Sequence, residues 1–266
     1  MERIADWGDL TGPLVVYGGV YSNLQAFEAL VTASGDVPPG NTICTGDIVA
    51  YCADAATSVA AVRRSGHRVI AGNCETQLAA NALDCGCGFE EGSTCDRLSA
   101  AWYAHANAEI GAKDRAWMTD LPDWAVFTHA GRRVLALHAA PSANNRFVWP
   151  VTEDEDLRRE VGIAVAAVGS VDLVLSGHSG IPFDRDLGGT RWVNAGVIGM
   201  PPHDGRAQTR YVRIEADGVV TLERLAYDPA ATVRAMERAG LTQGYHRTLM
   251  SGIWPSEDVL PDALRR

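Results

Sequence analysis

The sequence of 266 residues predicts one α/β domain, a four-layer α/β/β/α sandwich in which two mixed sheets are flanked by helices. Three observations lead to this prediction. Short apolar runs alternate with amphipathic segments of helical period in the first part of the chain. From Trp124 onward the pattern becomes that of strands, several of them joined as hairpins. Five of the apolar runs end on a small polar loop, which indicates buried strands that lead into one crevice.

The five apolar runs are short and continuous, as is typical of strands that are buried on both faces. They are PLVVYGG ending at Gly19, NTICTGD ending at Asp47, HRVIAGN ending at Asn73, RRVLALH ending at His138 and VDLVLSGH ending at His178. Because the active crevice of an open α/β sheet lies outside the carboxyl ends of its strands, the last four side chains are expected to meet there. The first loop differs, since it carries Gly18, Gly19 and Tyr21 and offers neither a carboxylate nor an imidazole.

Amphipathic patterns predict helices between and after these runs. They cover residues 24–31, 54–65, 75–83, 98–110, 113–118, 153–168 and 229–240. Ser22 and Asn23 are candidate caps for the first helix, and Glu75 is expected to satisfy the dipole at the start of the third. Later strands are expected at 124–128, 133–138, 185–187, 191–193, 210–214 and 219–225. A Cys/Gly-rich loop at 84–96 and a helical tail from about 229 to 266, whose last part packs on the surface, complete the single domain 1–266.

The balance of charge argues against a polyanionic partner. The net charge is −10, so we expect neither a nucleic-acid polymer nor an anionic membrane as the main partner. A small phosphorylated substrate or ligand remains compatible with this charge, because a bound metal dominates the field inside a cleft. The sequence makes no prediction of the oligomeric state.

The N-terminal segment indicates the cellular compartment of the protein, and the compartment in turn predicts the chemical state of the cysteines. MERIADWGDL is polar and acidic, without the basic and apolar regions of a signal peptide, and no apolar stretch is long enough to cross a bilayer. We therefore expect a cytoplasmic protein. In that compartment the six cysteines should be thiols or metal ligands rather than disulfides. They are Cys44, Cys52, Cys74, Cys85, Cys87 and Cys95.

The ordered polar loops resemble those of the calcineurin-like metallophosphoesterase superfamily, over about residues 13–225. The family segments read approximately D-x-H, G-D, G-N-H-[DE], H and G-H-x-H. The matching segments here are Gly19-Val20-Tyr21, Gly46-Asp47, Gly72-Asn73-Cys74-Glu75, His138 and Gly177-His178-Ser179-Gly180. The resemblance implies the metallophosphoesterase type of sandwich, with a site for two metals that share one aspartate.

The resemblance also assigns metal-ligand roles. It makes Asp47 the bridging carboxylate and places Asn73, His138 and His178 at the same metal. The other metal position lacks three ligands, because Gly19, Tyr21 and Gly180 stand where the family has Asp, His and His. Taken singly, each retained residue has a plainer interpretation, as a turn residue or as a buried hydrogen-bonding histidine.

Cys74, His138 and Arg146 are the predicted catalytic residues. Cys74 stands where the family has its general-acid histidine, and a free thiol with a pKa of about 8.5 is a weak acid. Arg146 follows the strand of His138 and suits bidentate phosphate binding, although a solvated loop arginine is an equal alternative. Further ligand candidates for the altered metal position are Cys52, Cys74, Cys85 and Cys87 as thiolates and Tyr21 as a phenolate.

The preferred hypothesis is a hydrolase of a phosphomonoester, phosphodiester or nucleotide that uses one or two divalent transition metals, Mn, Fe, Zn or Ni. A second hypothesis is a non-catalytic protein that binds a metal or a phosphorylated ligand, which the missing ligands favour. A third is a thiolate-dependent metal or redox protein built on Cys52, Cys74 and the 84–96 loop.

Overall fold

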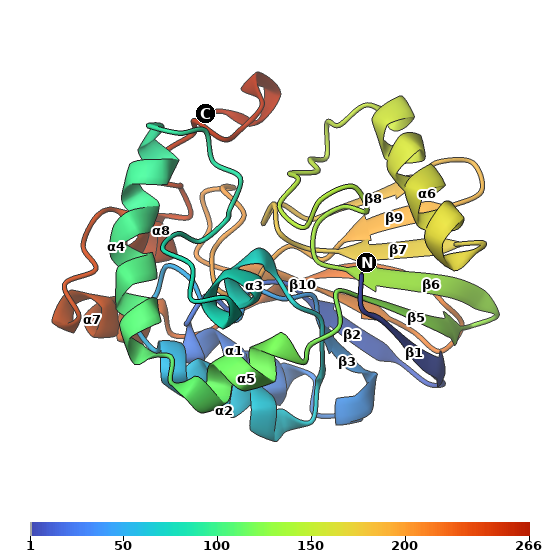
Figure 1. The fold of residues 1–266 in the computed structure, drawn as a ribbon, viewed down its shortest axis with the longest axis horizontal. Coiled ribbons are helices and arrows are strands. Elements are labelled where there is room, and N and C mark those ends of the chain that lie inside the picture. The colour runs from blue at the N-terminus through green and yellow to red at the C-terminus, as the bar shows by residue number, and fades with distance from the viewer. Residues whose placement is uncertain (1) are drawn as a thin grey trace.

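In the computed structural model, which describes residues 2–266, two sheets pack face to face and helices cover their outer faces (Figure 1). One sheet has the strand order β11 (Val220–Leu225), β10 (Thr209–Ile214), β2 (Leu14–Tyr17), β3 (Thr42–Cys44) and β4 (Arg68–Val69). The other has the order β1 (Ile4–Asp9), β5 (Trp124–His129), β6 (Arg132–Leu137), β7 (Leu173–Ser176), β9 (Arg191–Asn194) and β8 (Phe183–Asp186). The predicted α/β/β/α sandwich is confirmed.

Both sheets are mixed, and their parallel strands carry the polar loops. In the first sheet β2, β3 and β4 run parallel, and the hairpin of β10 and β11 adds antiparallel strands beside β2. In the second sheet β6, β7 and β9 run parallel. The loops after β3, β4, β6 and β7 therefore open at the carboxyl ends of two parallel sets, as the sequence predicts.

Strand β2 shows why these runs are apolar throughout. Leu14 and Val16 pack in the apolar layer between the two sheets, whereas Val15 and Tyr17 pack against the helices. All four side chains are fully buried. A strand that is covered on both faces cannot alternate apolar and polar residues, so its sequence reads as one continuous apolar run.

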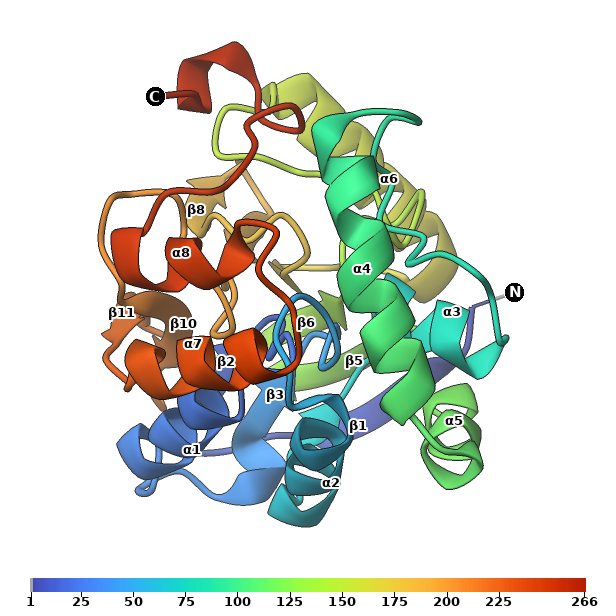
Figure 2. The same cartoon turned by 90° about the vertical axis from the view of Figure 1, so that its left-hand side faces the viewer.

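Most helices cover the outer face of the five-stranded sheet (Figure 2). They are α1 (Leu24–Ala33), α2 (Ala55–Ser65), α3 (Asn73–Ala79), α4 (Thr94–Glu109), α5 (Ala112–Thr119), α7 (Pro229–Arg238) and α8 (Tyr245–Ser251). Helix α6 (Asp154–Val168) covers the six-stranded sheet. Asn23 caps α1 as predicted, because its side chain accepts a hydrogen bond from the amide of Ala26. Helix α3 begins at Asn73 rather than at Glu75.

Strand β1 was not predicted from the sequence. Its residues, IADWGD, are polar enough to suggest an irregular terminus, yet they pair parallel with β5 at the edge of the six-stranded sheet. An edge strand that is largely exposed needs no apolar pattern, so the periodicity gives no signal there.

The last part of the chain packs on the surface only in part. Residues 245–266 were expected to pack on the surface, but Leu249 is fully buried in the helix-side core. Tyr245 and Trp254 line an internal pocket instead. Within residues 2–266, no helix is both long and apolar enough to cross a membrane.

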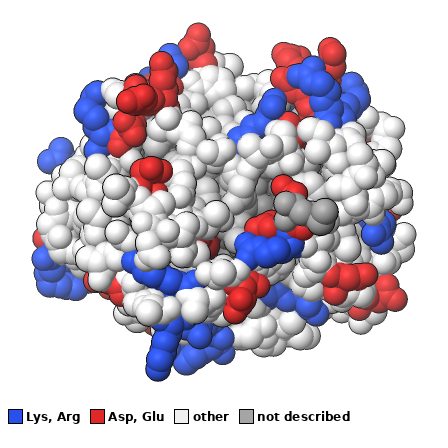
Figure 3. Space-filling model, in the orientation of Figure 1, with Lys and Arg blue, Asp and Glu red and all other residues white. Residues whose placement is uncertain are grey.

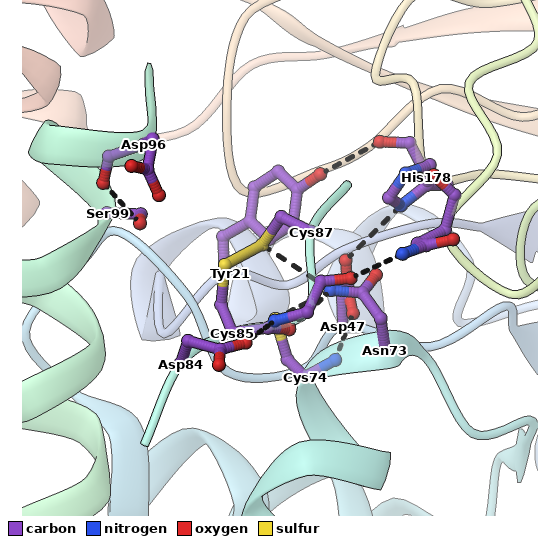
Figure 4. Close-up of a disulfide and its surroundings, with 12 residues drawn as sticks. Tyr21, Asp47, Asn73, Cys74, Asp84, Cys85, Cys87, Asp96, Ser99 and His178 are labelled. Carbon is purple, nitrogen blue, oxygen red and sulfur yellow. Dashed lines mark hydrogen bonds and ion pairs between the residues drawn. A yellow bond between two sulfur atoms is a disulfide. The ribbon is translucent and has the colours of Figure 1, made fainter. Parts of the chain in front are cut away.

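The expectation that all six cysteines are thiols or ligands was wrong. The structure joins Cys85 to Cys87 by a disulfide in the 84–96 loop (Figure 4). Two cysteines separated by one residue place their sulfur atoms close enough to pair once the loop turns at Gly86, which has a φ of 61°. Cys44, Cys52, Cys74 and Cys95 remain free and buried.

Candidate metal site

Four strand-end side chains converge at one point, as the sequence predicts. His138 Nε2 lies 3.0 Å from Asn73 Oδ1 and 3.0 Å from His178 Nδ1. Asp47 Oδ2 lies 3.3 Å from His138 Nε2 and 4.0 Å from His178 Nδ1. All four residues are buried. Asp47, His138 and His178 form the one group of three or more carboxylate, imidazole or thiol side chains in residues 2–266 that is compact enough to hold a metal ion.

Each of these side chains has its other polar atom tied to the backbone. Asp47 Oδ1 accepts from the Cys74 amide at 3.1 Å, and Asn73 Nδ2 donates to the Cys85 carbonyl at 2.9 Å. The ring nitrogens that point away from the cluster contact backbone carbonyls. His138 Nδ1 lies 2.6 Å from the Thr45 carbonyl oxygen, and His178 Nε2 lies 3.1 Å from that of Asn145. Such contacts require those nitrogens to be protonated, so the inner nitrogens are left as acceptors.

The cluster thus directs four acceptor atoms toward one another, and a proton or a metal ion between them would stabilise it. Burial acts to lower the pKa of His138, but the charge of Asp47 outweighs it and raises that pKa. Burial and the neighbouring His138 lower the pKa of His178 to about 3. These opposite shifts of the pKa make His138, rather than His178, the ring that holds a proton more strongly when no metal is bound. A divalent ion at this point would meet an Asp, an Asn and two His side chains. The donor set fits a transition metal.

Glu75 joins the two glycine loops beneath the cluster. Its carboxylate accepts from the amides of Asp47 at 2.7 Å, Ile48 at 2.8 Å and Gly72 at 2.9 Å. The side chain is fully buried, and burial together with the charge of Asp47 raises its pKa to about 7. Sequence reasoning assigned Glu75 only to the helix dipole. Its position three residues after Gly72 is the signal of a capping role, but its bonds to the other loop depend on tertiary contact.

The glycines before Asp47 and Asn73 are required by close packing. A Cβ on Gly46 would lie 2.4 Å from the amide nitrogen of Gly72, and one on Gly72 would lie 2.3 Å from Asp47 Oδ1. Asp47 itself has a left-handed backbone, with a φ of 58°. The Gly46-Asp47 and Gly72-Asn73 pairs therefore mark two backbone turns that pack directly against each other.

The 84–96 loop supports two of the ligands at once (Figure 4). The Cys85 carbonyl and Cys87 Sγ, at 3.4 Å, accept from Asn73 Nδ2. The Gly86 carbonyl accepts from Asn145 Nδ2 at 3.0 Å, and Asn145 in turn accepts from His178 through its own carbonyl. Cys85 and Cys87 were predicted as thiolate ligands. That prediction was wrong, because the two sulfur atoms are joined in a disulfide, and Asn73 is held by the Cys85 carbonyl and the Cys87 disulfide sulfur.

The position of the missing ligands is occupied by aromatic rings. A Cβ on Gly19 would lie 2.3 Å from Cε1 of Tyr21, so the tyrosine ring fills the space beside residue 19. The Tyr21 hydroxyl donates to the His178 carbonyl at 3.3 Å, and burial raises its pKa, which disfavours the phenolate needed for a ligand. Gly180 faces Trp254, whose Cζ2 would be 3.4 Å from a Cβ at that position.

The remaining predicted residues are not part of the compact group, although Cys74 Sγ lies 3.6 Å from Asn73 Nδ2 at its border. Cys52 and Cys74 are buried in the helix-side core, and burial raises the pKa of both thiols. A higher pKa makes Cys74 a weaker acid than a free thiol, and its catalytic role stays a prediction. Arg146 pairs with Glu160 at 3.1 Å, so phosphate binding by Arg146 would require that ion pair to open.

A two-sheet sandwich with Asp, Asn and His side chains converging at its strand ends defines the metallophosphoesterase class of fold and site. The model of the calcineurin-like phosphoesterase superfamily domain matches residues 14–218. The chain belongs to this superfamily.

Solved structures show the same fold. A metallophosphoesterase from Sphaerobacter thermophilus matches with a TM-score of 0.71 and 20% sequence identity, over 92% of this chain and 100% of that one. A hypothetical protein from Pyrococcus horikoshii OT3 matches with a TM-score of 0.74 and 17% identity, over 90% and 98% of the two chains. No curated protein was found to match this sequence.

Proposed function

We propose that this protein hydrolyses a phosphomonoester, a phosphodiester or a nucleotide phosphoanhydride with one divalent transition metal, Mn, Fe, Zn or Ni. The metal would be held by Asp47, Asn73, His138 and His178. The observation that carries the proposal is the convergence of four acceptor atoms, each on a side chain whose other polar atom is tied to the backbone.

The chain's own residues prepare the site for this chemistry. The carbonyls of Thr45 and Asn145 fix the tautomers of the two histidines, and Glu75 holds the turn that presents Asp47. A divalent metal bound there would supply a Lewis acid that polarises a phosphoryl oxygen and activates water. With Gly19, Tyr21 and Gly180 at three of its ligand positions, the family's other metal would keep only the shared Asp47 from this set, which supports a site with a single ion.

The test compares metal-stripped protein with protein reconstituted with each metal, using 4-nitrophenyl phosphate and bis(4-nitrophenyl) phosphate as substrates. We expect about one bound ion per chain by elemental analysis and metal-dependent hydrolysis. Asp47→Asn should lower both metal content and hydrolysis, the latter on the order of a hundredfold, because it removes the charged ligand. Asp9→Asn, at an exposed carboxylate of β1, is the matched control.

The competing proposal is a metal or phospho-ligand binding protein without hydrolysis, which the loss of three family ligands supports. Stoichiometric metal binding that depends on Asp47, without hydrolysis by any of the four metal forms, would decide for that alternative. Hydrolysis that persists in Asp47→Asn would overturn the single-metal proposal.

A further inference from the structure

Two of the three positions where the superfamily ligands are missing line one pocket. Tyr21 and Gly180 form part of its wall beside His178, one of the candidate metal ligands. The pocket leaves about 50 Å³ in which the centre of a water molecule can move. A small cavity, walled in part by the residues that replace two of the lost ligands, therefore lies next to the candidate metal site.

Aromatic rings dominate the wall of this pocket. Phe147 packs against the ring of His178, with 4.5 Å between the ring centroids. It also stacks on Phe89, with 6.0 Å between the centroids and an angle of 22° between the ring planes. Trp254 closes the side next to Gly180. The pocket wall contains no Asp, Glu, Lys or Arg. In Figure 3 the two parts that project at the top of the view carry groups of charged side chains, and the surface between these parts is mostly uncharged.

Two segments close the pocket, and hydrogen bonds hold each of them in place. The 84–96 loop contributes Phe89, and the chain after α8 contributes Trp254. The amide of Thr94 donates to Asp258 at 2.7 Å, which joins the two segments. Trp254 is held at both ends, by Nε1 donating to the Pro201 carbonyl at 2.7 Å and by its amide donating to His203 Nδ1 at 2.9 Å. The ring is thus fixed before any ligand arrives.

We propose that this aromatic pocket binds a planar, uncharged aromatic group of the phosphorylated substrate while the phosphate lies at the metal. An uncharged wall of rings cannot stabilise a phosphate, but it stacks well on another ring. His178 borders both sites, so one ligand with its ring directly beside its phosphate can occupy them together. This inference rests on the proposed function only for the position of the phosphate at the metal, and not for the binding of the aromatic ring.

The test measures binding of phenylphosphonate and methylphosphonate to the Mn²⁺-loaded protein by titration calorimetry. Phosphonates have no leaving group, so the comparison is free of differences in reactivity. We expect phenylphosphonate to bind at least roughly tenfold more tightly than methylphosphonate. Trp254→Leu and Phe89→Ala should each reduce this preference several-fold. Trp117→Phe, at a tryptophan that packs under Arg63 away from the pocket, is the control and should retain it.

Circular dichroism and thermal unfolding establish that each variant is folded, and Phe89→Ala, in the loop, tests the pocket if Trp254→Leu does not fold. Equal affinities for the two phosphonates, or a preference that both folded pocket variants retain, would overturn the aromatic pocket. A preference for phenylphosphonate that depends on Trp254 or Phe89 would support it even in a protein without hydrolysis. Failure of the hydrolysis experiment therefore leaves the pocket test intact.

Discussion

At the scale of single residues, the Glu75 carboxylate fixes the backbone turn that carries Asp47, although Glu75 is not itself a candidate metal ligand. It binds three backbone amides from two loops, and no water can reach it. A buried acceptor with three donors is costly to lose, because each amide is left without a partner. Its role is to position Asp47.

Replacing Glu75 by Gln should destabilise the protein and loosen the site. The amide group can accept at only one atom, so at least one backbone amide loses its partner, at a cost of about 2 kcal/mol. We expect a melting temperature several degrees lower and weaker metal binding. Glu28→Gln, at an exposed position of α1, is the control. Melting curves that coincide for the two variants would contradict this role.

The proton on His138 predicts a pH dependence of metal binding. The pKa of His138 is raised above its ordinary value of 6.5, while that of His178 is lowered to about 3. Metal binding must therefore displace one proton below the His138 pKa and none above it. The apparent affinity should rise about tenfold per pH unit as the pH increases toward that pKa and then level off. Metal titrations with proton release measured in two buffers check this. An affinity that falls as the pH rises through this range would contradict it.

At the scale of elements, the 84–96 loop acts as a support for the strand-end ligands rather than as a ligand source. Its carbonyls at Cys85 and Gly86 contact Asn73 and Asn145, and the second of these holds His178. Residues 84–93 belong to no strand and no helix, yet they bridge Asn73, at the start of α3, and Asn145, in the loop after β6. Its contacts are the kind of outer-shell interactions that tune metal affinity.

Removing the link between this loop and His178 should weaken metal binding without removing a ligand. Asn145→Ala deletes the side chain that donates to Gly86 but retains the carbonyl that accepts from His178. We expect a loss of about tenfold in metal affinity, within the range for outer-shell changes. Asn144→Ala alters the neighbouring residue, for which no side-chain contact to the loop is seen, and is the matched control. The same affinity in both variants would show that the loop does not position His178.

At the scale of the whole molecule, the candidate metal site is built where the two sheets meet, and the adjoining pocket is completed by the last segment of the chain. The five-stranded sheet provides Asp47 and Asn73, and the six-stranded sheet provides His138 and His178. The last segment, beyond the part that the superfamily model matches, contributes Trp254 to the adjoining pocket. The metal site thus depends on how the sheets pack, and the pocket depends on a segment that follows both sheets.

The sequence by itself determined the sandwich, most of its helices and strands, and the convergence of four strand-end side chains. It could do so because buried parallel strands read as apolar runs, and residues at their carboxyl ends share one crevice. Only the tertiary structure decided what replaces the missing ligands, how Cys85 and Cys87 pair, and that Glu75 reaches Asp47. Exposed β1 and the last segment were missed for a related reason. These features arise from contacts between side chains and loops far apart in the chain, and local periodicity carries no record of which distant surfaces meet.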